Sequence, residues 1–318
     1  MRLVIRADAT RATGTGHVMR SCVIAESAVS VGIDCLFVGN LGGIEWLENK
    51  VKEIGFSEIL HDVSELKINT LTDVLVLDTY DDSESTILDL EWLGKIVIVD
   101  PISPNFRADL RFHTGLQADW NKDSDSQFYG CGEYILVRKE LREVQSIPKN
   151  MDSRLDIMVT GGGSDPFDFC AEIASVLLKF EDDFRVNFIT DAPGSIPRDS
   201  RFFVFPPGKI FKELLPRIDL VFTPASTTCL EMLSLGIPQG IAKIVENQDS
   251  NYQILTKEGS VLGIGSRNSS GMWEFNLDEI AKLVRSSSLR NSLSEKKSVK
   301  YDSLGSERMI RIILDFYT

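Results

Sequence analysis

Two glycines and a histidine stand close together near the start of the chain. Residues 6–20 read RADATRATGTGHVMR, a polar turn expected between a first strand and a first helix, with Gly14, Gly16 and His17 in its second half. Glycines let the backbone approach a ligand closely, and an ordinary imidazole, which titrates near pH ~6.5, can take a proton from water at neutral pH. The pattern therefore indicates a general base. The alternative is that the glycines shape a turn and His17 caps a helix.

This glycine pattern fits neither of two common nucleotide-binding motifs. The dinucleotide fingerprint requires a third glycine three residues after Gly16, where Met19 stands instead. The P-loop motif also fails, because no Gly-Lys-Ser/Thr follows. The sequence therefore predicts no nicotinamide site here, and we expect no cofactor.

A second loop of interest, residues 160–166, reads TGGGSDP and follows an apolar run. Its three consecutive glycines expose flexible amides, which suit a diphosphate lying over the domain junction. An interdomain hinge or a tight turn is the alternative, because hinge glycines and phosphate-binding glycines look alike in a sequence.

A third loop, residues 223–231, reads TPASTTCLE and leads from a strand into a helix. Ser226, Thr227 and Thr228 would bring three hydroxyls to the positive end of the helix, where phosphate oxygens are favoured. Glu231 follows Thr228 by three residues, which is also the spacing of a capping box that needs no ligand. A carboxylate here could instead accept hydrogen bonds from ribose hydroxyls.

No residue pattern in the chain predicts a metal site. Asp123 and Asp125 resemble the D-x-D of metal-dependent sugar transferases, but they lie in a polar run without a strand to deliver them, so a solvated loop is expected. His61 and His113 have no partner at ligand spacing. We therefore expect no bound metal.

The composition is that of an ordinary globular protein. The 318 residues, 43% apolar and 25% charged, suffice for two domains of about 100 to 200 residues each. Five cysteines, an odd number without a C-x-x-C pair, favour a reducing cytoplasm over disulfides or a thiolate metal site. The chain shows neither a signal peptide nor an apolar run of about 18 residues, so no membrane span is expected. A net charge of -13 disfavours nucleic acid as a partner.

Short apolar runs alternate with longer amphipathic ones, which is the pattern of β-α repeats that build a parallel sheet. We expect an α/β fold with two Rossmann-like domains facing one another across a cleft at the carboxyl ends of both sheets. The first domain is expected over 1–145, the second over 146–305, and a C-terminal helix over 306–318 that packs back on the first domain. Strands are expected at 3–6, 35–38, 74–77, 96–99, 155–159, 185–189 and 220–222, and helices at 18–31, 44–54, 169–180 and from Ser226 or Thr228 to Leu235.

Several of these stretches together resemble a known family, the nucleotide-sugar hydrolases of pseudaminic acid biosynthesis. That family cleaves UDP-2,4-diacetamido-2,4,6-trideoxy-β-L-altropyranose and looks like the two-domain (GT-B) fold of the glycosyltransferases that build peptidoglycan lipid intermediates. Only the GHVMR stretch at 16–20 is specific by itself. The likeness covers residues 5–8 (IRAD), 14–20 (GTGHVMR), 77–80 (LDTY), 129–130 (YG), 134–136 (YIL), 162–166 (GGSDP), 226–228 (STT) with Glu231, 235–238 (LGIP) and 247–248 (NQ).

The resemblance implies a metal-independent hydrolysis that releases UDP and a free sugar. In it His17 matches the catalytic histidine, and water attacks the anomeric carbon with inversion and C–O cleavage. Tyr80 and Asn247 match residues on the sugar side, and UDP is held mainly by the second domain. The residues matched to the nucleotide side are Ser164, Ser226, Thr227, Thr228 and Glu231; the remaining expected substrate contacts are Asp8, Gly16, Arg20, Gly163 and Gln248.

The chain departs from the family at two loops. Pro101 follows Asp100 where the family usually shows a second aspartate, and Pro224 precedes Ala225 where it usually shows glycines. Because proline removes backbone freedom where phosphate would approach, the substrate can differ from that of the family. Two alternatives stay open: a glycosyltransferase with a UDP-sugar donor, and a non-catalytic sugar-nucleotide binding protein.

Overall fold

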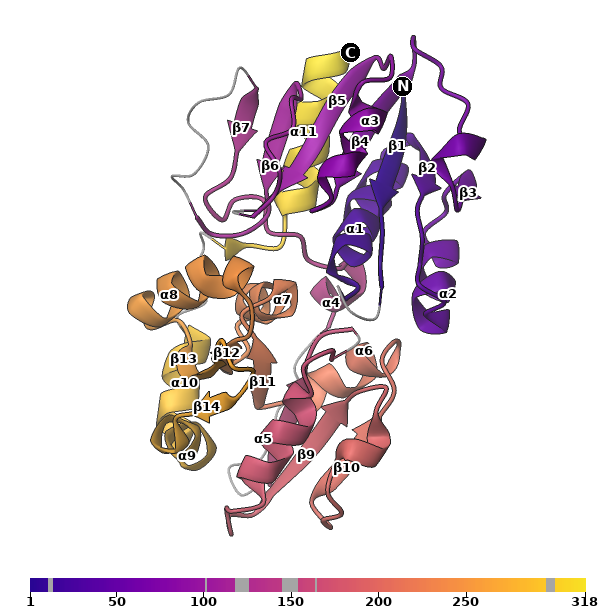
Figure 1. The fold of residues 1–318 in the computed structure, drawn as a ribbon. Helices are drawn as coiled ribbons and strands as arrows, with labels where there is room; N and C mark the ends of the chain where they lie inside the picture. Colours follow the sequence, from indigo (N-terminus) through magenta and orange to yellow (C-terminus); the bar gives the residue numbers. More distant parts are fainter. Residues whose placement is uncertain (11–13, 101, 118–125, 145–153, 164, 296–300) are drawn as a thin grey trace. The chain divides into compact units, whose positions relative to one another are not determined.

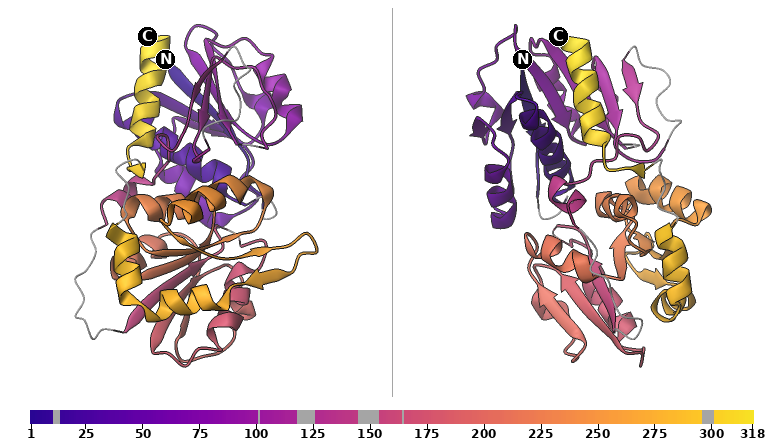
Figure 2. Two further views of the ribbon diagram at one scale, coloured as in Figure 1. Left: turned by 90° about the vertical axis from the view of Figure 1, so that its left-hand side faces the viewer. Right: turned by 180° about the vertical axis from the view of Figure 1, so that it is seen from behind.

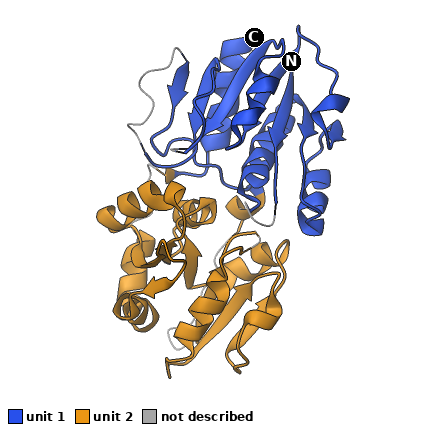
Figure 3. Cartoon of the chain, in the orientation of Figure 1, with its two compact units in different colours: residues 1–139, 302–318 blue, residues 140–301 orange. Residues whose placement is uncertain are grey.

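Alternating strands and helices build each half of the chain in the computed structural model. The structure describes residues 1–10, 14–100, 102–117, 126–144, 154–163, 165–295 and 301–318. These form two units, one of Met1–Lys139 with Asp302–Thr318 and one of Glu140–Tyr301 (Figure 3). Pro101, Ser164, Asp123 and Asp125, which the sequence singled out, lie outside the described residues.

The first unit is built on a parallel sheet (Figure 1). Its central strands are buried on both faces, which is why they read as continuous apolar runs in the sequence. Every neighbouring pair of strands in it is parallel. The strand order is β3 (Glu58–Leu60), β2 (Asp34–Val38), β1 (Arg2–Ala7), β4 (Asp73–Asp78), β5 (Gly94–Val99), β6 (Leu110–His113) and β7 (Gln127–Tyr129).

Side chains alternate between two apolar layers along these strands. Leu3 and Ile5 pack toward α1 (Gly16–Ser30), α2 (Glu45–Glu53) and α11 (Gly305–Tyr317), whereas Val4 packs on the opposite face. The short α3 (Ser85–Leu88) belongs to a cluster with β4 and β5.

Helix α11, the last element of the chain, lies beside α1 in the first unit (Figure 2). Its apolar residues recur at helical spacing, and Met309, Ile310 and Ile313 are buried against the unit's core. The Ser27 hydroxyl of α1 donates a hydrogen bond of 2.8 Å to Ser306 Oγ of α11 and so joins the two helices. The final residues therefore complete a core that the first residues begin.

The second unit repeats the architecture with a second sheet. The neighbouring strands are parallel except for β13 and β14, which form an antiparallel pair. The strand order is β10 (Phe202–Phe205), β9 (Phe184–Ile189), β8 (Leu155–Thr160), β11 (Leu220–Pro224), β12 (Gln239–Lys243), β13 (Leu262–Arg267) and β14 (Trp273–Phe275). The helices of this unit are α5 (Phe169–Leu177), α6 (Ile210–Leu214), α7 (Thr227–Leu235), α8 (Asp249–Glu258), α9 (Leu277–Arg285) and α10 (Ser287–Glu295), with α4 (Lys139–Arg142) at the change between units.

Each sheet reverses its strand order once. In the first sheet β1 lies between β2 and β4, and in the second sheet β8 lies between β9 and β11. Open parallel sheets bind ligands beyond the carboxyl ends of their strands at such a reversal. In this chain the loops that follow β1, β4, β8 and β11, together with the helices α1 and α7 that two of them lead into, carry most of the site residues expected from the sequence.

Candidate functional site

The loop after β1 brings His17 to the first turn of α1. Gly14 closes a turn by donating from its backbone N–H to the Thr10 carbonyl at 2.9 Å, and its φ of 84° favours glycine. Gly16 has no such backbone requirement, and a Cβ at this position would meet no atom within 4 Å. Conformation therefore accounts for Gly14, whereas neither conformation nor packing accounts for Gly16.

The imidazole of His17 contacts the last residue of β4 and a residue of the loop that follows it. Its Nδ1 lies 3.1 Å from the backbone oxygen of Asp78 and 3.2 Å from Oδ1 of the same residue. Its ring meets the Tyr80 ring edge to face, with centroids 4.3 Å apart. The side chain is 15% exposed, so the ring is held by neighbours on one side and still reaches solvent.

Arg20, one turn further along α1, joins two carboxylates in the interior of the unit. Its Nε and Nη2 donate to the two oxygens of Asp78, and its Nη1 donates to Asp100 Oδ2 at 2.9 Å. Tyr80 donates its hydroxyl to the same Asp100 oxygen at 2.5 Å. The structure therefore brings together three expected residues, His17, Arg20 and Tyr80, around two aspartates.

Asp78 and Asp100 were not among the expected site residues. Each stands at the carboxyl end of a strand, β4 and β5, where an acidic residue after an apolar run is the signal that could have identified it. Burial favours a neutral Asp100, but the Arg20 charge and the Tyr80 hydroxyl outweigh burial and lower the pKa of this carboxyl to about 2.

His113 extends this row of polar side chains to the next strand. It ends β6 and pairs with Val99 in the ladder, one residue before Asp100. Its Nδ1 lies 3.2 Å from the Gln117 backbone oxygen, and the side chain is buried. Burial lowers the pKa of His113 even though the Asp100 charge acts in the opposite direction.

Asp8 belongs to a different cluster at the end of β1. Its carboxylate accepts hydrogen bonds from the Arg6 guanidinium and, at 2.7 Å, from the Asn40 backbone N–H. Arg6 also pairs with Glu84. Burial opposes the charge on Arg6, yet the two carboxylates raise the pKa of the guanidinium above its ordinary value. These contacts give Asp8 a structural role in the turn that begins the loop.

In the second unit, the glycine loop after β8 is partly explained by its own packing. A Cβ at Gly161 would lie 1.8 Å from Asp165 Oδ1, so a side chain cannot be accommodated there. The Asp165 carboxylate accepts from the backbone N–H groups of Phe169 and Cys170, at the start of α5. Burial raises the pKa of Asp165.

The middle of that glycine loop is open. Gly162 has a φ of 99°, and a Cβ there would meet no atom within 4 Å. Gly163 is half-buried, whereas Ser164, which was expected to contact the nucleotide, lies outside the described residues.

Helix α7 begins at Thr227, with Ser226 as its N-cap residue in an extended conformation. Ser226 makes no side-chain capping bond, and its buried Oγ has no hydrogen-bond partner within the described part of the chain. The fully buried Thr223 Oγ1 is likewise unpartnered there. Because Thr228 lies inside the helix, it is not the N-cap residue that a capping box with Glu231 would require.

Pro224 is compatible with the strand that contains it. Pro224 pairs with Ala242 of β12, and the Ala225 backbone N–H continues that ladder by donating to the Ala242 carbonyl at 2.9 Å. On the other side, the pairing of β11 with β8 ends at Phe222. The backbone N–H that proline lacks would therefore lie beyond the end of the ladder with β8, so the strand tolerates proline at this position.

The loop after β12 closes toward the start of α7. Gln248 accepts the Ile244 backbone N–H at 2.9 Å through Oε1, which shapes the turn, and Asn247 is half-buried beside it. Asn251 of α8 donates to the Ala225 carbonyl at 3.4 Å, a contact that the sequence did not suggest. Glu231 is buried within α7.

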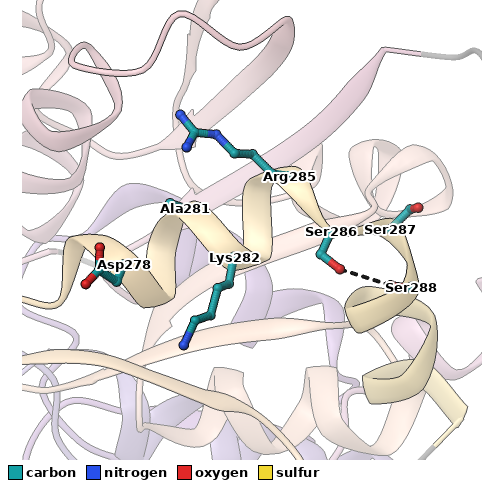
Figure 4. A pocket seen from close by; sticks show the side chains of 7 residues that line it. All are labelled: Asp278, Ala281, Lys282, Arg285, Ser286, Ser287 and Ser288. Carbon is teal, nitrogen blue, oxygen red and sulfur yellow. Dashed lines mark hydrogen bonds between the residues drawn. The ribbon is translucent and has the colours of Figure 1, made fainter.

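A shallow hollow on the second unit lies apart from all of these residues (Figure 4). Its two cations are paired, Lys282 with Glu279 and Arg285 with Asp182. None of the expected site residues contributes to it. The lining residues are Asp278, Ala281, Lys282, Arg285, Ser286, Ser287 and Ser288.

Among the described residues, no group of three or more His, Cys, Asp or Glu side chains could hold a metal ion. No described helix combines the length and apolar character that a membrane crossing requires.

Comparison with known proteins relates the chain to enzymes of nucleotide sugars. No protein-family model matches it. It is 27% identical over 190 residues to a UDP-2,4-diacetamido-2,4,6-trideoxy-β-L-altropyranose hydrolase of Campylobacter jejuni, covering 56% of this chain and 66% of the relative. It is 25% identical over 267 residues to an uncharacterized protein of Methanocaldococcus jannaschii, covering 75% of this chain and 54% of the relative. The chain thus spans less than two thirds of the length of each relative.

Solved structures with the same fold match nearly the whole chain. MurG of Acinetobacter baumannii aligns with a TM-score of 0.60 at 13% identity, over 99% of this chain and 100% of that chain. A UDP-N-acetylglucosamine 2-epimerase aligns with a TM-score of 0.61 at 14% identity, over 100% of this chain and 97% of that chain. The predicted fold class, two Rossmann-like domains of the GT-B type, is confirmed, as is the resemblance to the hydrolase.

Proposed function

We propose that the chain is a nucleotide-sugar hydrolase in which His17 activates water. The observation that carries the proposal is the His17 ring, held by Asp78 and Tyr80 beyond the strand reversal between β1 and β4 and still partly exposed. Ligands of open parallel sheets bind at this position. The likeness to the Campylobacter jejuni hydrolase supports a UDP-linked diacetamido sugar as the class of substrate.

The start of α7 is the proposed site for the diphosphate. A helix N-terminus presents backbone N–H groups and a partial positive charge, both of which favour phosphate oxygens. Ser226 and Thr223 add buried hydroxyls that have no partner within the described residues. Thr227 and Thr228 stand in the first turn of the same helix.

The reaction requires one base and a stabilised leaving group. His17 takes a proton from water, the water oxygen bonds to the anomeric carbon, and the bond from that carbon to the UDP oxygen breaks with its electron pair leaving on UDP. Attack opposite the leaving group inverts the configuration. Amides at the α7 start offset the charge that develops on the phosphate, so no further acid is needed in this scheme.

Incubation with a panel of UDP-activated N-acetyl and diacetamido sugars in oxygen-18 water tests this function. The label is expected in the released sugar and absent from UDP. His17→Ala is expected to lower kcat by about 100- to 10,000-fold, because general-base catalysis typically supplies that factor, with UDP binding retained. Full activity of His17→Ala would remove the histidine from the mechanism.

A glycosyltransferase is the second candidate, favoured by a fold shared with a solved glycosyltransferase of Rickettsia africae. The same labelling experiment separates the two activities. If UDP appears only when a sugar or lipid hydroxyl is supplied, and no oxygen-18 enters the sugar, the chain transfers the sugar to that hydroxyl.

A further inference from the structure

Asp78 contacts His17 with both its backbone and its side chain. The His17 Nδ1 atom lies 3.1 Å from the Asp78 carbonyl oxygen and 3.2 Å from the carboxylate Oδ1. A carbonyl oxygen only accepts hydrogen bonds, so a hydrogen bond at this distance requires a proton on Nδ1. In the neutral ring, the other nitrogen, Nε2, then has no proton.

We infer that Asp78 is a positioning residue that fixes the His17 ring with its proton on Nδ1, so that Nε2 is the atom that accepts a proton from water. This inference rests on the proposed function and names the reacting atom within it. The Asp78 side chain is fully buried at the end of β4, and its position is fixed by strand pairing on both sides, with β1 and with β5. A rigid strand end therefore holds the base.

Arg20 compensates the negative charge of the Asp78 carboxylate, which lies beside His17. Its guanidinium donates to both Asp78 oxygens, and one of these oxygens, Oδ1, lies 3.2 Å from His17 Nδ1. An unpaired carboxylate beside an imidazole would favour the protonated ring, which cannot act as a base. The ion pair thus orients the ring while limiting that effect.

The other polar groups around the ring belong to the same network. Tyr80 packs its ring against His17 and donates its hydroxyl to Asp100, which also accepts from Arg20. His113 interacts electrostatically with Asp100 and Arg20 from the neighbouring strand. Among the described residues, the network around the His17 ring therefore holds the carboxylates of Asp78 and Asp100 and the Arg20 guanidinium, with Tyr80 and the buried His113 as further titratable groups.

Nitrogen-15 NMR of the imidazole rings tests the inference without any substrate. The chain has three histidines, so the signals can be assigned by single substitutions. At a pH where the ring is neutral, His17 is expected to carry its proton on Nδ1. His113, whose Nδ1 also faces a backbone carbonyl, is the positive reference, and the exposed His61 is the solvent reference. A proton on Nε2 of His17 would overturn the inference, whether or not any sugar is hydrolysed.

The variant Asp78→Asn separates positioning from stability. It replaces the carboxylate beside His17 Nδ1 with a neutral amide, so a larger share of the neutral His17 ring is expected to carry its proton on Nε2, as read from the nitrogen-15 shifts. If the chain hydrolyses a sugar nucleotide, kcat is expected to fall about 10- to 100-fold with KM within about twofold, because the base is misplaced rather than the ligand.

Asp73→Asn is the matched control. Asp73 is a fully buried carboxylate at the opposite end of β4, and it forms the same kind of two-point pair with Arg2. Its loss is expected to destabilise the unit without changing the position of the His17 ring proton or KM. An Asp78→Asn variant whose His17 proton is placed as in Asp73→Asn would contradict the positioning role. A failed hydrolysis assay with the expected proton position would instead count against the proposed function alone.

Discussion

At the level of single residues, the positive charge of Arg20 is shared between two aspartates. Its guanidinium lies between Asp78 and Asp100, both at the carboxyl ends of neighbouring strands. Without it, two carboxylates would face each other near the His17 ring in a largely buried site, a costly arrangement. The expected contact of Arg20 with the substrate stays a prediction, and the contacts that the structure shows for it are with Asp78 and Asp100.

The Asp100 carboxyl makes stability depend on acid pH. Its pKa is about 2 in the folded chain and ~3.8 when unperturbed, so its contribution to the free energy of unfolding is full above pH ~4 and is lost as pH falls toward 2. The contribution amounts to about 2 kcal/mol. Urea unfolding of Asp100→Asn and the unmodified chain between pH 5 and 3 is expected to show a smaller pH dependence in the variant. An equal pH dependence would contradict the assignment.

At the level of elements, the first turn of α7 lacks the capping bond that its residue types suggest. Ser226 stands at the N-cap, but its hydroxyl makes no hydrogen bond to the helix N–H groups. A serine cap ordinarily contributes about 1 kcal/mol through that bond. The missing bond supports the proposal that the Ser226 hydroxyl binds phosphate. Stability measurements can distinguish this role from helix capping.

Ser226→Ala is therefore expected to leave the thermal stability of the free chain nearly unchanged and to reduce the stabilisation by UDP. Removing one hydrogen bond to a charged phosphate would weaken binding by roughly tenfold, which thermal shifts across a UDP titration measure. The control is Asn276→Ala, since Asn276 caps α9 by accepting from the Glu279 N–H at 3.2 Å. That variant should lose about 1 kcal/mol of stability with UDP binding intact. Equal UDP responses of both variants would exclude the phosphate role.

At the level of the whole molecule, the first unit combines both ends of the chain. Residues 302–318 belong with residues 1–139, and α11 packs beside α1. The contact is close at Gly305, where a Cβ would lie 2.2 Å from the backbone oxygen of Ile135. Backbone atoms cannot turn aside as a side chain can, so the first turn of α11 requires glycine at this point.

Gly305→Ala is expected to destabilise the first unit by about 1 to 3 kcal/mol, the usual cost of overpacking. Gly194→Ala is the matched control in the second unit, because a Cβ there would meet no atom within 4 Å and its backbone is not left-handed. Differential scanning calorimetry should show a lower transition temperature for the first variant and little change for the second. A stable Gly305→Ala chain would mean that α11 can dock without this close contact.

The sequence alone determined the local features of this protein. Apolar runs located β1, β2, β4, β5, β8, β9 and β11, and the polar residues after them located the loops around His17, Gly162 and Ser226, because periodicity and glycine content act over a few residues. It missed short or weakly apolar strands such as β3, β7 and β14, whose formation depends on a neighbour to pair with.

Only the tertiary structure decided which loops meet. The expected fold placed His17 at a helix start, but the partners of its ring, Asp78 and Tyr80, come from the end of β4 and the loop after it. Strand β4 lies beside β1 although β2 and β3 separate them in the sequence. Likewise, Asp100 and His113 join the network because parallel pairing aligns the ends of β4, β5 and β6. Strand order is set by the packing of the entire sheet, so local patterns cannot specify it.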